Sequence, residues 1–199
     1  MDYSHFKAPY IGIGQIRELA DQSRDKYWGS DIPIDIEKVL MKLKIKVIPT
    51  PDLKRLAGID SFITSDWKSV YVDNEAYLED HKYKRVRFSM AHELGHFLLH
   101  KKLYESLGIK SLEDYYNFCE KAPARQYGFL ETQANNFAGC FLVPKPVLKE
   151  YKEKLLIKLR KQLAVHGIED IDLTEYIIDP LAEQFSVSTE PIRIALQTL

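Results

Sequence analysis

The chain has 199 residues, of which 45% are hydrophobic and 29% are charged, proportions typical of a soluble globular protein with a core of its own. Its formal net charge of −1 excludes a global positive field that would attract nucleic acid or an anionic membrane. No secretory signal pattern and no apolar run long enough to cross a bilayer is visible. Two cysteines are too few for a disulfide framework. We therefore expect a cytoplasmic protein without a membrane partner.

Hydrophobic periodicity predicts the elements of the first half of the chain. Helical spacing covers residues 11–28, and Pro33 marks the start of a second helix. The alternating KIKVIP that follows predicts a short strand. Residues 56–74 predict two more strands around a turn at Ser65–Asp66. We expect a small, mostly antiparallel sheet of three or four strands, packed against helices in an α+β fold.

Two longer helices are predicted in the second half of the chain. The first runs from about residue 85 to 101. The second covers residues 129–143 and ends at VPKP, because prolines disfavour its continuation. Residues 103–128 between them predict a loop with a short helix near residues 112–119.

The composition changes after the second of these helices. Residues 146–166 carry six Lys or Arg and two Glu, whereas residues 167–190 carry seven acidic residues and no Lys or Arg. We therefore predict a main domain over residues 1–145 and a helical C-terminal region over residues 146–199.

The stretch AHELGHFLLH, residues 91–100, places polar side chains in an otherwise apolar helix. On a helical wheel His92, Glu93, His96 and His100 share one sector. A helix that is apolar nearly all round is buried, and buried histidine and glutamate need partners. Two imidazoles one turn apart can bind one Zn²⁺, and Glu93 is placed to take a proton from water beside the ion. The alternative is a pair of hydrogen-bonded core histidines.

A catalytic zinc site needs a third protein ligand. His100 lies about 12 Å along the helix from His92 at about 1.5 Å per residue, so we read it as a supporting group. Glu131, in ETQANNFAGCFLVP, is the better candidate, with Asn135 one turn later to orient a ligand. The small residues Ala138–Gly139 would let this helix lie close to the HExxH helix. An ordinary amphipathic helix is the alternative reading of this segment.

Together, RFSMAHELGHFLLH and ETQANNFAGCFLVP resemble the ImmA/IrrE-type metallopeptidases, whose pattern is HELGHxxLH followed by ExEAxxFAxxLLMP. The resemblance covers about residues 10–146. Gln133 departs from it, because the family has a second glutamate there. Family members act on transcriptional repressors, often in mobile elements or stress responses, so a repressor is the implied partner and substrate. The resemblance implies a gluzincin-like peptidase with one zinc ion per chain, His92, His96 and Glu131 as its ligands, and Glu93 as the general base.

A rival reading comes from the end of the chain, LAEQFSVSTEPIRIALQTL, which resembles a helix-turn-helix with a turn at residues 186–188. The protein would then be a DNA-binding or repressor-binding regulator with a structural or inactive HExxH. Charge argues against a nucleic-acid partner, because Arg193 is the only basic residue after position 166. The intact Glu93 argues against a pure binding module, which needs no general base.

Two features of the predicted reaction stay open at this level. No residue is assigned as the donor to the oxyanion, since Tyr116 and Tyr127 both read as packing aromatics. The strand SVYVD, residues 69–73, is either a sheet edge that pairs with an extended substrate or an internal strand.

Overall fold

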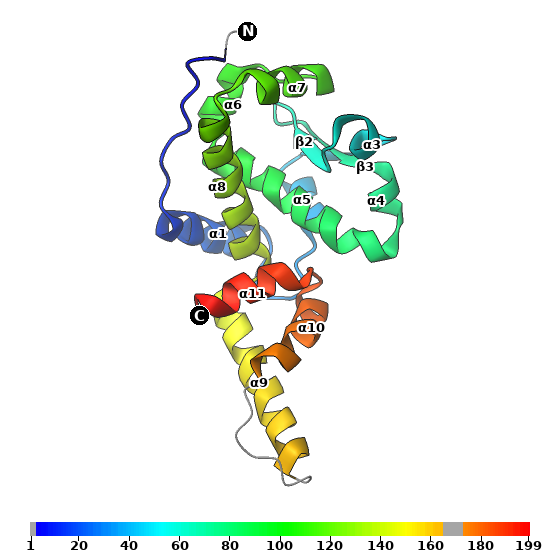
Figure 1. The fold of residues 1–199 in the computed structure, drawn as a ribbon, viewed down its shortest axis with the longest axis vertical. Helices are drawn as coiled ribbons and strands as arrows, with labels where there is room; N and C mark the ends of the chain where they lie inside the picture. Colours follow the sequence, from blue (N-terminus) through cyan, green and yellow to red (C-terminus); the bar gives the residue numbers. More distant parts are fainter. Residues whose placement is uncertain (1–2, 165–172) are drawn as a thin grey trace.

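The computed structural model describes residues 3–164 and 173–199, and in this part of the chain eleven helices surround one three-stranded sheet (Figure 1). The strands are Lys46–Thr50 (β1), Ser61–Ile63 (β2) and Ser69–Asp73 (β3). The helices of the first half are Ile13–Tyr27 (α1), Ile36–Lys42 (α2), Leu53–Ala57 (α3), Asn74–Leu78 (α4) and Asp80–Leu99 (α5). Those of the second half are Lys101–Leu107 (α6), Leu112–Lys121 (α7), Ala124–Leu142 (α8), Lys145–Ala164 (α9), Thr174–Phe185 (α10) and Thr189–Gln197 (α11).

The α+β fold class is confirmed, but the sheet is mixed rather than mostly antiparallel. Its order is β1-β3-β2: β3 pairs in parallel with β1 over five residue pairs and antiparallel with β2 over three. The short helix α3, which has no periodic signal in the sequence, separates β1 from β2. The hairpin of β2 and β3 therefore joins β1 through its second strand.

Two predicted boundaries differ from the structure. α5 starts at Asp80 instead of near residue 85, and α8 starts directly after its N-cap, Pro123. Gly128 lies inside α8 and does not interrupt it. The segment predicted as a loop with one short helix contains α6 and α7, and a capping box between Ser111 and Asp114 starts α7.

The centre of the fold is the contact between α5 and α8, the most extensive contact between any two described elements. α5 also packs on β2 and β3, so it lies between the sheet and α8. Gly95 permits the close approach: a Cβ atom there would lie 3.2 Å from the Cα and O atoms of Ala134 and from Cβ of Phe137. The expectation that Gly139 serves this contact is wrong, because a Cβ atom at Gly139 would meet nothing within 4 Å.

The C-terminal helices return to the body of the molecule. α9 extends away from it, and α10 and α11 lie back beside the start of α9 (Figure 1). The buried guanidinium of Arg87 on α5 donates to the carbonyl oxygens of Phe185, Ser186 and Ile34. It thereby joins α5 to the turn between α10 and α11. Among the described helices, none has the length and apolar character needed to cross a membrane.

Candidate metal centre

Three potential ligands converge between α5 and α8. His92 and His96 lie one turn apart on α5, and Glu131 faces them from α8. The Nε2 atoms of the two histidines are 2.9 Å apart. The Glu131 oxygens lie 3.3 Å from Nε2 of His92 and 3.4 Å from Nε2 of His96. All the donor atoms fall within 4.8 Å of one another, so one ion can contact all three side chains.

The chemistry of this cluster fits a divalent metal. Two imidazoles and one carboxylate are a ligand set of catalytic zinc sites. Within the described residues, Oε1 of Glu131 is buried and forms no hydrogen bond. A buried carboxylate oxygen needs a partner, and a cation between the Nε2 atoms would supply one.

The tautomer of His92 follows from its second nitrogen. Nδ1 of His92 lies 2.8 Å from Oδ1 of Asn135. An amide oxygen only accepts, so Nδ1 carries the proton and donates it. The lone pair of Nε2 then points at the cluster. Asn135 therefore lies one turn beyond Glu131 and contacts His92, a candidate ligand.

The tautomer of His96 follows from a longer chain of hydrogen bonds. Nε2 of Gln133 donates to the carbonyl oxygen of Pro9 at 2.7 Å, which fixes the orientation of the amide. Its Oε1 accepts from Nε2 of His100 at 2.9 Å, so Nδ1 of His100 is unprotonated. That atom accepts from Nδ1 of His96 at 3.1 Å. The lone pair of His96 Nε2 is thus also directed at the cluster.

Glu93 is buried beside the cluster, where Oε1 accepts a hydrogen bond of 2.7 Å from the Ser61 hydroxyl. Ser61 lies on β2, the edge strand nearest this part of α5. The ring of the buried Tyr104 covers His96, with 4.9 Å between ring centroids. Two elements besides α8 therefore hold the side chains of the HExxH motif.

Burial and neighbouring charges shift the pKa values of these groups. Burial alone would lower the pKa of His92, but the hydrogen bond to Glu131 and the charges of Glu93 and Glu131 raise it to about 9. Burial alone would raise the pKa of Glu131, yet its histidine partners lower it below its usual range. Burial and the nearby His96 lower the pKa of His100 to about 3, so His100 is neutral. Without a metal, His92 carries a second proton on Nε2, beside the ionised Glu131, and a metal ion would have to displace this proton to reach the lone pair.

Other candidates from the sequence do not join the cluster. Tyr127 forms a hydrogen bond with Tyr115 and an edge contact with Phe118, and Tyr116 is exposed. The SVYVD strand, β3, is the central strand and is not an edge.

Sequence reasoning missed Ser61, Tyr104 and Pro9 as neighbours of the site. Ser61 is 32 positions from Glu93, and Pro9 is 124 positions from Gln133. No local pattern signals contacts over such separations. Gln133 alone gave a signal in the sequence, because the family pattern has a glutamate at that position.

A comparison with known protein families matches the part of the chain that contains α5 and α8. The family model Peptidase_M78, described as IrrE N-terminal-like domain, matches residues 76–197. This chain belongs to that family. The match includes both halves of the metal cluster and continues through α11, which confirms the resemblance found in the two motifs. No curated protein sequence matches the chain.

Solved structures add a fold-level likeness. A Mycobacterium tuberculosis transcriptional regulator superposes with a TM-score of 0.55 at 18% sequence identity. The match covers 92% of this chain and 46% of the regulator, so this chain spans about half the regulator's length. At this identity the comparison shows a shared fold.

Proposed function

We propose that this protein is a zinc-dependent peptidase that hydrolyses peptide bonds in a regulatory protein, with a transcriptional repressor as the substrate. The observation that carries the proposal is the convergence of His92, His96 and Glu131, with Glu93 adjacent on the same helix. Membership of the Peptidase_M78 family supports peptidase chemistry. The likeness to a transcriptional regulator and the resemblance of the two motifs support a regulatory setting. We propose a cytoplasmic location because two cysteines are too few for a disulfide framework.

In this proposal each residue has a defined task. His92, His96 and Glu131 hold one zinc ion, while Asn135 and His100 orient the two imidazoles. A bound zinc ion supplies Lewis acidity, which acidifies water and polarises a carbonyl group.

Glu93 is the general base in this proposal. Ser61 fixes Oε1 of Glu93, so proton transfer uses Oε2, which takes a proton from the attacking water and passes it to the leaving amine. The donor to the oxyanion stays unassigned.

The test is Glu93→Gln in the zinc-loaded protein. We expect zinc content to stay the same and cleavage of a proteome-derived peptide pool, measured as new N-termini by mass spectrometry, to fall at least 100-fold, because general-base catalysis typically contributes 10²–10⁴-fold. Glu120→Gln, at an exposed position on α7, is the matched control and should cleave like wild type. Equal cleavage by Glu93→Gln and wild type would exclude the assigned role.

Binding of a repressor without cleavage is the second candidate function. It is favoured by the helix pair α10–α11, which lies in the segment whose sequence resembles a helix-turn-helix. It predicts that a repressor is held intact by wild type and by Glu93→Gln alike.

A further inference from the structure

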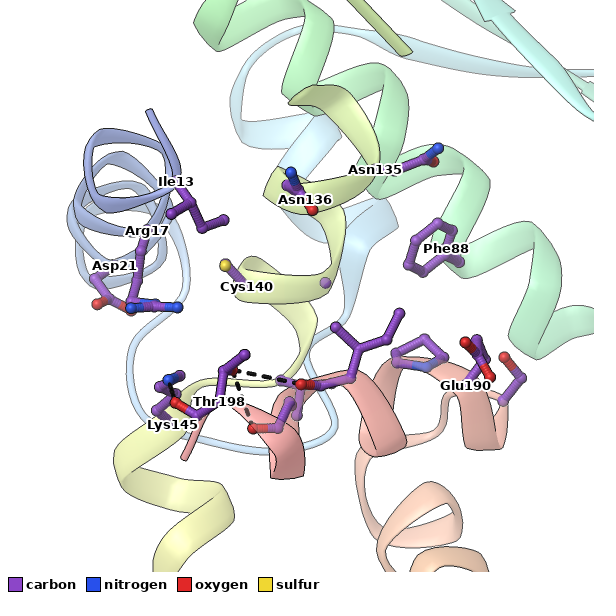
Figure 2. A pocket seen from close by; sticks show the side chains of 16 residues that line it. Ile13, Arg17, Asp21, Phe88, Asn135, Asn136, Cys140, Lys145, Glu190 and Thr198 are labelled. Atoms are coloured by element: carbon purple, nitrogen blue, oxygen red, sulfur yellow. Dashed lines mark hydrogen bonds between the residues drawn. The ribbon is translucent and has the colours of Figure 1, made fainter. Parts of the chain in front are cut away.

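A pocket of about 530 Å³ is lined by residues of α1, α5, α8 and α11 (Figure 2). Phe88 lies one turn before His92 on α5, Asn135 lies one turn after Glu131 on α8, and both line the pocket. Asn135 also accepts the hydrogen bond from His92. The pocket and the cluster therefore share a wall.

The pocket is mainly apolar and open. Ile13 and Phe88 point into it from opposite sides in Figure 2. Ile13 is 50% exposed and Ile194 is 53% exposed, so large aliphatic side chains at its rim stay uncovered. Its volume lies in the range of about 300–1,000 Å³ that ligand pockets have. The apolar lining comes from three helices and the C-cap of α8, and it consists of Ile13, Phe88, Val143, Pro191, Ile194 and Ala195.

Gly139 of α8 leaves space on one side of the pocket. A Cβ atom at this position, which is partly buried near the end of α8, would meet nothing within 4 Å. A methyl group there would have open space beside the pocket, into which a longer side chain can extend.

We propose that this pocket receives an apolar side chain of the peptide that the metal cluster cleaves, and that it selects the sequence that is cut. The inference rests on the proposed function for the identity of the occupant. One helical turn along α5 is about 5.4 Å, and an extended peptide advances about 3.3 Å per residue. Gly139 lies eight positions, about 12 Å, beyond Glu131 on α8. The selected side chain therefore lies about two to four residues from the scissile bond. The amide of Asn136, which also lines the pocket, can bond to the peptide backbone.

This assignment gives the C-terminal helices a role. Pro191, Ile194 and Ala195 of α11 form one wall of the pocket. The helix-turn-helix-like end of the chain is then a part of the peptide-binding site, which agrees with its lack of a basic surface.

The test fills the pocket by Gly139→Leu. Gly128→Leu is the matched control, because it lies on the same helix, outside the pocket, and a Cβ atom there also meets nothing within 4 Å. Leucine favours a helix more than glycine does, so both variants should fold and bind zinc like wild type. Should Gly139→Leu fail to fold, Ile194→Asp at the exposed rim replaces it. The probe is a pool of decapeptides with randomised positions, assayed for cleavage and, in the Glu93→Gln background, for binding by equilibrium dialysis.

We expect wild-type products to be enriched in Leu, Ile, Val, Met or Phe about two to four residues from the cut. Gly139→Leu should lower cleavage and binding of these peptides at least tenfold, and Gly128→Leu by less than twofold. The inference would be overturned if the products showed no apolar enrichment or if no peptide bound. It would also be overturned if Gly139→Leu cleaved and bound these peptides like wild type. Apolar peptides that bind, are not cleaved by wild type, and are released by Gly139→Leu would support the pocket and refute the peptidase proposal.

Discussion

At the scale of single residues, the direction of each histidine lone pair depends on side chains outside the ligand set. For His96 this control passes through His100 and Gln133 to the Pro9 carbonyl. The glutamine amide contributes one acceptor and one donor to this chain, and a carboxylate could not donate to Pro9. The departure from the family pattern at position 133 is therefore matched by a contact with the N-terminal segment.

Gln133→Leu tests this chain of hydrogen bonds. Loss of the amide leaves His100 free to change tautomer, so we expect zinc affinity to fall by about 10–100-fold, as when outer partners of a metal ligand are removed. Competition with a chelator measures the affinity, and ¹⁵N NMR of the metal-free protein should show Nδ1 of His96 losing its proton. Gln162→Leu, on the exposed side of α9, is the control. Unchanged affinity together with an unchanged His96 tautomer would contradict the assignment.

At the same scale, the pairing of His92 with Glu131 makes the stability of the metal-free protein depend on pH. The pKa of His92 in the metal-free protein, about 9, lies above its ordinary value of 6.5. Its stabilising pairing with Glu131 is therefore complete below pH 6.5 and is lost as the pH rises through 9. The pKa of Glu131 is lowered from 4.5, so its contribution is complete above pH 4.5 and is lost only in stronger acid.

We therefore expect the melting temperature of the metal-free protein to fall between pH 6.5 and 9, relative to Glu131→Gln. Zinc affinity should rise over the same interval, because the metal has to displace the His92 proton at lower pH. Calorimetry at several pH values measures both effects. If the melting temperature changed with pH in the same way in both proteins, the pairing of His92 with Glu131 would not form.

At the scale of elements, the site depends on how closely α5 and α8 approach. Gly95→Ala would place a methyl group 3.2 Å from backbone atoms of Ala134, which cannot move independently of their helix. We expect a loss of about 1–3 kcal/mol in the free energy of unfolding, as for overpacked cores. Gly139→Ala has open space instead and should gain up to about 1 kcal/mol from helix propensity. Urea denaturation compares the two, and equal effects would contradict the packing described for this interface.

The same two helices show what sequence can predict. HExxH and its buried environment are local patterns with a helical period, and both elements were predicted as helices that face each other. The sequence analysis expected Ala138 and Gly139 to permit the close approach and did not consider Gly95. The reason is physical: a helical wheel shows which residues share a face and does not show which face meets the partner. The order of the strands likewise depends on α3, five residues with no periodic signal.

At the scale of the whole molecule, the C-terminal helices are attached to the site by specific contacts. Arg87 is five positions before His92 on α5 and reaches the carbonyl groups of the turn after α10. α11 lines the pocket beside the cluster. The predicted division at residue 145 falls between α8 and α9 and stays a prediction, while the family match runs across it. The sequence predicted the helical C-terminal region by composition but not its return to α5 and α8, which depends on contacts nearly 100 positions apart.

The most direct test of the central claim is the zinc content of wild type and Glu131→Ala, each prepared with added zinc, desalted and measured by mass spectrometry. Glu120→Ala, exposed on α7, serves as the control. We predict about one zinc ion per chain for wild type and control, and a sharp loss for Glu131→Ala. No zinc in wild type, or equal zinc in Glu131→Ala, would contradict a metal centre shared by α5 and α8.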